Sequence, residues 1–372
     1  MLFCQRWAVL VSVLLQVAIA KVHVPVTPVS TDRAVTFQYV ENTLPLAAQT
    51  HEVIMVPKTS VMLVSQMSNS VLIKARVDRQ GVFQHLGAFQ LGNNSSGLHG
   101  LAPSKAYKGK VWVTLQNDNL IVLLDPRVDD ISAAPKVVKV IRVPKPGLGP
   151  HYVGEYGDEL WSTMQTSSHV LRINHKDTDV YSIYKAQPKP VFIAKHPING
   201  MFYTGQDDSS SVMQINPKTG ETKQIAIPVN AGQTPVGMIS GPLGIWFVLL
   251  GTGEKGTGTF GHIDADGKVK FHKLSSALGA NASLLHLAID PHPDISHTIW
   301  FLTSSIINPK ALDSVIKVVF NPTYSEIIKE EVTVLPTQQC KAHRIWLTDT
   351  TVFATELTSS KVFAWSKAAA AK

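Results

Sequence analysis

The sequence predicts an all-β fold, a seven-bladed β-propeller, from three observations. Helical periodicity is almost absent, and short runs alternate at period two, as Ile73, Ala75 and Val77 do with their polar neighbours. Turn-forming residues separate these runs, for example at 216–220 (Asn-Pro-Lys-Thr-Gly). A large apolar residue also recurs just after a turn at intervals of 41 to 54 residues. Such a period is typical of propeller blades.

The repeated apolar residue sets the number of blades. It occupies seven positions: Met62, Trp112, Trp161, Phe202, Trp246, Trp300 and Val352. The corresponding blades are expected at 51–90, 97–144, 150–187, 190–228, 234–274, 283–335 and 341–365. In each blade the run before the repeated residue should form the innermost strand, and the run through it the second strand. The run 35–40 is expected to add the outer strand of the last blade and so close the ring.

The first twenty residues have the features of a signal peptide. Arg6 supplies a positive start, an apolar run follows, and residues 18–20 (Ala-Ile-Ala) form a cleavage site. We therefore expect residues 21–372 to be one secreted propeller domain. Cys340 is then the single cysteine of the mature chain, and three asparagines lie in glycosylation motifs: Asn93, Asn94 and Asn281.

The distribution of charged and apolar residues limits the classes of partner that the protein is expected to bind. The net charge is +7, but the basic residues are scattered and none of the nucleic-acid-binding motifs is present. After the signal peptide no run reaches the roughly 18 apolar residues that a spanning helix needs. We expect a small-molecule ligand, no nucleic-acid or membrane partner, and a monomer.

Two columns of residues should meet at one mouth of the ring. Successive strands of a blade are antiparallel, so the start of the inner strand lies beside the end of the second strand. The second strands end, four residues after the repeated position, in Gln66, Gln116, Gln165, Gln206, Leu250, Ser304 and Glu356. The inner strands begin with Glu52 (after His51), His99, His151, Phe192, Val236, His286 and His343.

These columns allow two interpretations. Glutamines that bridge blades, and histidines that bond to carbonyl groups, would account for them structurally. Several histidines and one carboxylate that converge on an axial mouth would instead form a metal or acid–base site.

The repeat wording resembles one known family. Ile245-Trp246-Phe247, Ile299-Trp300-Phe301 and the strand and turn 212–220 are similar to the streptogramin B lyases (virginiamycin B lyase and relatives), which are seven-bladed propellers. The resemblance covers most of the mature chain. Family members carry a histidine that opens the sixth blade, a histidine that opens the seventh, and a glutamate that closes the second strand of the seventh; these match His286, His343 and Glu356. Leu285 and Ala342 stand where the family has proline.

The resemblance implies a carbon–oxygen lyase that acts by elimination, or a cyclising enzyme, on a lactone, ester or related natural product. A base takes the proton next to a carbonyl, and a cation such as Mg²⁺ stabilises the enolate. By this resemblance His343 is the general acid/base, His286 a second acid/base or orienting group, and Glu356 the metal ligand. Five further residues are expected to line the mouth: His99, His151, Gln116, Gln165 and Gln206.

Two alternatives remain open at this point. The mouth could be a recognition surface for a ligand or a protein, without catalysis. A third class is a metal oxygenase in which four histidines from four blades hold one iron, as in carotenoid-type oxygenases. His99, His151, His286 and His343 would then be the ligands.

Overall fold

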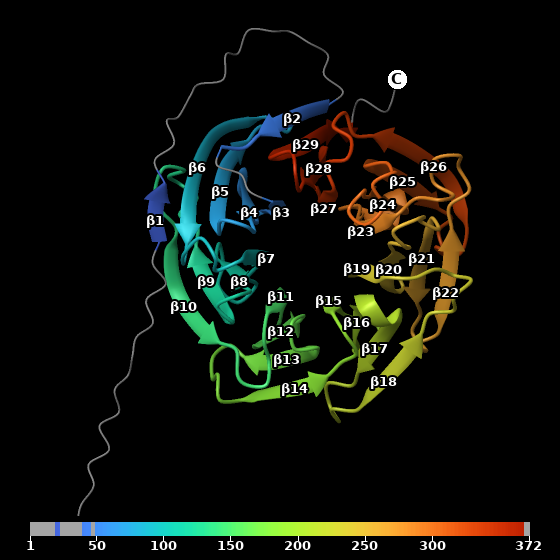
Figure 1. Ribbon diagram of the computed structural model, residues 1–372, viewed down its shortest axis with the longest axis horizontal. Coiled ribbons are helices and arrows are strands. Elements are labelled where there is room, and N and C mark those ends of the chain that lie inside the picture. Colours follow the sequence, from blue (N-terminus) through green and yellow to red (C-terminus); the bar gives the residue numbers. More distant parts are fainter. Residues whose placement is uncertain (1–18, 23–38, 46–48, 368–372) are drawn as a thin grey trace, which may run out of the picture.

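The computed structural model describes residues 19–22, 39–45 and 49–367. Seven antiparallel sheets stand in a ring whose inner strands surround a common axis, here called the channel (Figure 1), which confirms the predicted propeller and its blade count. The innermost strands are β3, β7, β11, β15, β19, β23 and β27, as expected. The predicted signal peptide lies outside the described residues except for Ile19 and Ala20.

Blade 1 comprises β3 (Thr50–Met55), β4 (Val61–Gln66), β5 (Val71–Val77) and β6 (Phe83–Leu91), with β1 (Ile19–Val22) paired outside β6. Blade 2 comprises β7 (Leu98–Pro103), β8 (Val111–Leu115), β9 (Leu120–Asp125) and β10 (Lys136–Arg142). Blade 3 comprises β11 (Pro150–Tyr156), β12 (Glu159–Met164), β13 (His169–Asn174) and β14 (Tyr181–Lys185). Blade 4 comprises β15 (Pro190–Lys195), β16 (Phe202–Gln206), β17 (Ser211–Ile215) and β18 (Thr222–Ala226), with the short helix η1 (Asp207–Ser209).

Blade 5 comprises β19 (Pro235–Gly241), β20 (Gly244–Leu249), β21 (Thr259–Ile263) and β22 (Val269–Lys273). Blade 6 comprises β23 (Leu284–Ile289), β24 (Thr298–Thr303), β25 (Ser314–Phe320) and β26 (Ile327–Val334), with the short helix α1 (Pro293–Ser296). Blade 7 comprises β27 (Ala342–Leu347), β28 (Thr351–Glu356), β29 (Lys361–Ser366) and β2 (Tyr39–Thr43). In the described part of the chain no helix is long and apolar enough to cross a membrane.

The ring closes as the sequence predicts, through a strand from the N-terminal part of the chain. β2 pairs with β29 in an antiparallel register that runs from Tyr39 opposite Trp365 to Thr43 opposite Lys361. The described strand begins at Tyr39, so it overlaps only the end of the predicted run 35–40. Residues 35–38 lie outside the described part of the chain. Closure leaves blade 7 with four strands and covers the free edge of β29.

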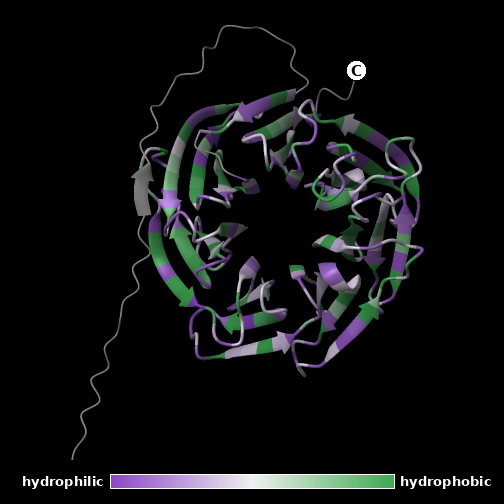
Figure 2. Ribbon diagram, viewed as in Figure 1, coloured by the Kyte–Doolittle hydropathy of each residue, from purple (hydrophilic) through white to green (hydrophobic). Residues whose placement is uncertain are grey.

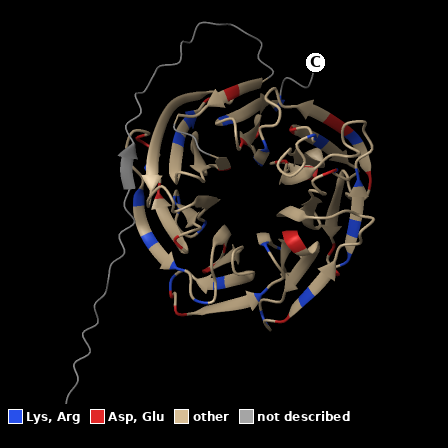
Figure 3. Cartoon of the chain, in the orientation of Figure 1, with Lys and Arg blue, Asp and Glu red and all other residues tan. Residues whose placement is uncertain are grey.

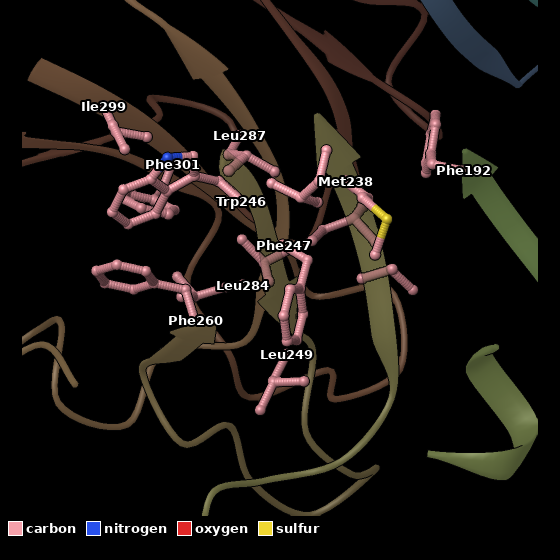
Figure 4. Packing of buried hydrophobic residues seen from close by; sticks show 14 of the residues in the cluster. Phe192, Met238, Trp246, Phe247, Leu249, Phe260, Leu284, Leu287, Ile299 and Phe301 are labelled. Atoms are coloured by element: carbon pink, nitrogen blue, oxygen red, sulfur yellow. The ribbon is translucent and has the colours of Figure 1, made fainter. Parts of the chain in front are cut away.

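The core lies between the blades, because each sheet buries both faces against its neighbours. The seven repeated residues all fall on second strands, and each is at most 2% exposed. Middle strands such as β4, β20 and β24 are buried along their whole length, whereas outer strands such as β18 and β22 are largely exposed and carry more polar residues (Figure 2). In Figure 4, Trp246, Phe260 and Phe301 pack together, while Phe192 lies apart on another strand. Burial of such side chains stabilises the fold by roughly 25 cal/mol per Å².

Each inner strand has an irregular register near its start. In blade 1, for example, Thr50 pairs with Gln66 but Val53 pairs with Val64, so one residue is added to the inner strand. The same shift occurs in the other six blades. A bulge of this kind changes the direction of the side chains around it. Here it decides which residues face the channel.

Candidate functional site

The bulges place two rows of side chains at the mouth of the channel. The residues directly after the first paired residue of each inner strand form the first row: His51, His99, His151, Val191, Val236, Leu285 and His343. The next residues form the second row: Glu52, Gly100, Tyr152, Phe192, Gly237, His286 and Arg344. The sequence analysis predicted one column of residues at the starts of the inner strands, and the structure shows that this column combined members of both rows. His51 takes the place assigned to Glu52, and Phe192 and His286 belong to the second row.

The histidines of the first row come from four adjacent blades and contact one another. The ring centroid of His51 lies 3.8 Å from the centroids of both His99 and His343, and the ring centroids of His99 and His151 are 4.0 Å apart. In all four residues the Nδ1 atom is buried and has no hydrogen-bond partner among the described residues. Buried polar atoms of folded proteins usually have partners, so this arc is unusual. It is the strongest sign of a ligand site in the molecule.

Hydroxyl groups hold the backbone of this arc in place. Ser65 Oγ donates to the carbonyl oxygen of His99 (2.9 Å) and accepts from the amide of Glu52 (3.0 Å). Thr355 Oγ1 makes the same pair of bonds, to the His51 carbonyl (2.7 Å) and from the Arg344 amide (2.9 Å). Each hydroxyl thus fixes the bulge of its own blade and joins it to the next blade.

Blades 2 and 3 carry the same clamp. Thr114 accepts from Gly100 N (2.7 Å) and donates to His151 O (3.3 Å). Thr163 accepts from Tyr152 N (3.3 Å) and donates to Val191 O (2.7 Å). The clamps therefore fix the backbone of His51, His99 and His151 and leave their imidazoles for other contacts.

A charged cluster lies in the second row. The Arg344 Nε atom is 3.2 Å from Oε2 of Glu52, and the guanidinium stands 5.1 Å from the centre of the Phe192 ring. Arg344 Nη1 also contacts His286 Nε2. Because arginine can only donate, this contact makes Nε2 the acceptor, while His286 Nδ1 lies within hydrogen-bond distance of both the carbonyl oxygen (2.9 Å) and the amide nitrogen (2.8 Å) of Leu287. His286 is thus occupied as a support for Arg344.

Burial keeps the imidazoles neutral. It lowers the pKa of His99 and of His343 to about 3, and neighbouring His99 and Arg344 add to the effect on His343. Burial also holds the pKa values of His51, His151 and His286 well below the ordinary value. Neutral imidazole is the form that can accept a proton or bind a metal ion.

The second row contains a buried acid as well. Burial raises the pKa of Glu52, and the charge of Arg344 opposes that rise. The carboxyl group thus depends on its arginine partner for its charge.

A cavity of about 170 Å³ adjoins both rows. Its polar wall contains His151, His286 and His343 together with Gln165 and Asp207. Figure 3 shows the acidic turn of η1, which carries Asp207, close to the channel. The other lining residues are apolar: Val191, Phe192, Val236, Leu250, Leu285, Ile306 and Ile307. A largely apolar lining with a few convergent polar groups is typical of small-molecule sites.

Glu356 has different surroundings from the axial histidines. Ser359 Oγ donates to its carboxylate, and Glu41 and Lys361 are its charged neighbours. Burial, followed by the adjacent Glu41, raises the pKa of Glu356 to about 7. Strand pleating explains this position: Glu356 shares a sheet face with Val352 and Ala354, which pack in one cluster with blade 6. Its predicted role as a metal ligand shared with His343 is not what these contacts favour.

The predicted glutamines have mainly structural contacts. Gln116 Nε2 donates to Gln165 Oε1 (3.1 Å) and so joins blades 2 and 3. Gln206 bonds within blade 4, to Ser211 Oγ (2.8 Å) and Gln224 Oε1 (2.5 Å). Gln66 accepts from Thr50 (3.1 Å). Of this column only Gln165 and Leu250 line the cavity.

The remaining predicted residues are placed as follows. Asn93, Asn94 and Asn281 are exposed, as a glycan would require, and glycosylation itself stays a prediction. Cys340 is buried and unpaired. No functional role was predicted from the sequence for His51 or for Arg344. Each belongs to a dipeptide of a histidine and a charged residue at the start of an inner strand (His51-Glu52 and His343-Arg344), and this repeated dipeptide is the signal that could have found them.

Comparison with known proteins supports the fold. No family model matches the chain, and no curated protein matches it. A catalytically inactive virginiamycin B lyase from Staphylococcus aureus, solved with quinupristin, superposes with a TM-score of 0.68 at 17% identity, covering 88% of this chain and 98% of that one. A streptogramin B lyase structure gives 0.67 at 18% identity, with 88% and 96% covered. A chain of the mitotic checkpoint complex gives 0.66 at 11% identity, with 94% and 98% covered.

These comparisons show that the chain is similar in fold to the streptogramin B lyases, as the sequence predicted. At these identities they establish the fold and no more. Propellers with other roles match almost as well. The site must therefore be interpreted from its own residues.

The Mg²⁺ that the resemblance implies can be tested against these residues. Mg²⁺ prefers oxygen ligands and keeps several waters. Glu356 is adjacent to the ammonium group of Lys361, which competes for its charge, and the axial donors are mainly imidazole nitrogens. Neither set of residues fits Mg²⁺.

Proposed function

We propose that the axial cavity is the active site of a lyase-type enzyme, which removes a proton next to a carbonyl group of a small, largely apolar ester or lactone. The observation that carries this proposal is the composition of the cavity lining. His151 and His343, whose Nδ1 atoms have no partner among the described residues, line the cavity together with apolar residues such as Phe192. A neutral imidazole accepts the proton, and the apolar wall excludes water and holds the substrate.

The cavity limits how much of a substrate enters. Its volume of about 170 Å³ is below the roughly 300–1,000 Å³ of pockets that enclose a drug-sized ligand. The reacting ester and its neighbouring carbons fit in this space, and the rest of a larger molecule remains outside the mouth. Arg344 contacts His286 and lies 5.1 Å from the centre of the Phe192 ring, and both of these residues line the cavity, so its positive charge favours the enolate that forms when the proton leaves.

The roles of two predicted residues change in this proposal. His343 keeps its predicted acid–base role, and His151 is a second candidate with the same unpartnered Nδ1 atom. His286 becomes a positioning residue for Arg344, because both of its ring nitrogens are engaged. No step is assigned to Glu356.

A panel of macrocyclic lactones and linear esters tests the proposal. Elimination opens a lactone ring without a change of mass, whereas hydrolysis adds one water, so mass spectrometry separates the two reactions. Loss of the general base should lower turnover by about 10²- to 10⁴-fold in His151→Ala or His343→Ala. The exposed His85 supplies a matched control, His85→Ala, which should retain full turnover.

Recognition without catalysis is the second candidate function. The similarity to a chain of the mitotic checkpoint complex, at a TM-score of 0.66, favours it as specifically as the lyase likeness favours an enzyme. This second function would be supported if compounds of the panel bind at the cavity but none of them is converted to product. Secretion and a monomeric state are part of the proposal and rest on the sequence alone.

A further inference from the structure

One group at the axial mouth has the composition of a metal site. His51, Glu52 and His343 each offer one ligand atom, and these three atoms lie within 4.8 Å of one another. They come from two adjacent blades, 1 and 7, and no described protein group satisfies the Nδ1 atoms of the two histidines. We infer that His51, Glu52 and His343 bind a divalent transition-metal ion.

The spacing fits an ion after a small adjustment. Nitrogen and oxygen ligands lie about 2.0–2.2 Å from Zn²⁺, so two ligands of one ion are roughly 3–4 Å apart. The observed limit of 4.8 Å exceeds this by about 1 Å, which side-chain rotation supplies. Larger backbone movement is not needed, because the three residues already share one side of the channel.

The backbone of the site is held as a metal site requires. Thr355 Oγ1 donates to the His51 carbonyl and accepts from the amide of Arg344, the residue after His343. One hydroxyl therefore joins the two strands that carry the ligands. Rigid supports of this kind fix ligand geometry.

Glu52 is oriented for two partners. Its Oε1 atom faces His51, with 4.0 Å between Oε1 and Nδ1, whereas Oε2 lies 3.2 Å from Arg344 Nε. One carboxylate oxygen thus lies near His51, while the other forms an ion pair with the guanidinium without a hydrogen bond between Oε2 and Nε. This arrangement leaves net positive charge when a divalent ion is bound. An anionic oxygen, as in a carboxylate, an enolate or hydroxide, would complete the site.

The donor types select the metal. Two imidazoles and one carboxylate suit Zn²⁺, Fe²⁺, Co²⁺ or Ni²⁺, whereas Mg²⁺ is disfavoured by nitrogen ligands. The site differs from both sets predicted from the sequence, since Glu356 and His286 are absent from it. His343 lines the cavity, so the ion would lie at the cavity wall. His343 would then serve as a ligand, and His151 would remain as the proton acceptor of the proposed reaction.

Metal binding can be measured without any substrate. The purified full chain is stripped with a chelator and titrated with Co²⁺ alone, followed by calorimetry and by the visible absorption of the bound ion. We expect about one Co²⁺ per chain with mixed nitrogen and oxygen ligation. The affinity for Co²⁺ should fall at least tenfold in His51→Gln, Glu52→Gln and His343→Gln, because each variant loses one imidazole or carboxylate ligand.

Two controls separate the site from general histidine binding and from misfolding. His85→Ala removes an exposed histidine and should leave Co²⁺ binding unchanged. Circular dichroism and thermal unfolding check that each variant folds, and Glu52→Gln is the mildest change because it keeps shape and volume. The inference is overturned if the parent binds no Co²⁺, or if all three folded variants bind it like the parent. Either result leaves the lyase proposal standing, since turnover is measured separately.

Discussion

The buried carboxylates of this propeller fall into two environments. Asp313 accepts four hydrogen bonds, from the amides of Ser305 (2.9 Å), Cys340 (3.0 Å) and Ala342 (2.9 Å) and from Ser305 Oγ (2.8 Å). Glu52, equally buried, has one ion pair with Arg344 and stands beside imidazoles that lack partners. Asp313 joins blade 6 to the start of β27, and Glu52 faces the channel.

Glu155 repeats the first pattern at another blade boundary. It accepts from Trp112 Nε1 (2.6 Å), Lys105 N (2.9 Å) and Ala106 N (2.6 Å), and so joins blade 3 to blade 2. Both carboxylate groups that join these blades, Asp313 and Glu155, are thus satisfied by several hydrogen bonds. An unsatisfied buried polar group costs about 1–3 kcal/mol. The Nδ1 atoms of the axial histidines have no hydrogen-bond partner among the described residues, which is expected of groups that contact a ligand.

The largest expected effect on stability is for Asp313, the carboxylate with four hydrogen bonds. Asp313→Ala removes an acceptor from three buried amides, so the free energy of unfolding should fall by about 3–5 kcal/mol. Urea denaturation measures it. A loss below about 1 kcal/mol would show that full hydrogen bonding does not mark the supporting groups.

Acid should act next, through the axial arc. The pKa of His99 is about 3 in the folded protein, against an ordinary value near 6.5. As the pH falls below 6.5 the unfolded chain binds a proton that the folded chain does not, so stability falls between pH 6.5 and about 3. The loss from pH 7 to 5 should be about 2 kcal/mol for this residue. Denaturation of the parent and of His99→Leu at both pH values isolates it, and equal losses in the two proteins would contradict it.

Glu356 should respond in the opposite direction. Its pKa is raised to about 7 in the folded protein, so its contribution to stability is complete below pH 4.5 and is lost as the pH rises through 7. Glu356→Gln removes that loss, and the variant should be about 1 kcal/mol more stable than the parent at pH 8. Gln206 already occupies the matching position of blade 4. Thermal unfolding at pH 5 and pH 8 gives the comparison, and destabilisation at pH 8 would refute it.

The smallest effect is expected for an axial histidine at neutral pH. His99→Leu removes ring nitrogens, one of which has no partner, and keeps apolar contacts, so stability at pH 7 should stay within about 1 kcal/mol of the parent. Chemical denaturation at pH 7 is the measurement. If the loss approaches that of Asp313→Ala, the arc supports the fold and the comparison fails.

The sequence predicted the fold well because its signals are local. The repeated position from Met62 to Val352 and the turns between strands mark seven blades without any knowledge of contacts. Ring closure followed from the same logic. His99, His151 and His343 were also placed at the correct mouth, since strand direction alone determines which end of a blade they occupy.

The details of the site could not be predicted in the same way. One added residue in each inner strand moves Glu52, Phe192 and His286 out of the first row, and no sequence pattern marks the bulge. Glu356 was assigned to the mouth by its distance from Val352. Because side chains alternate between the two faces of a strand, Val352 and Glu356 lie on the same buried face of β28. Arg344 was overlooked because its partners lie on blades 1, 4 and 6.

The central claim is that the axial histidines form a ligand site. Diffraction from crystals soaked in Co²⁺, recorded at the cobalt absorption edge, tests it most directly. We predict an anomalous peak at the mouth of the channel, within bonding distance of His51, Glu52 and His343. A fully soaked crystal with no peak there, and ordered water on every one of these imidazoles, would contradict it.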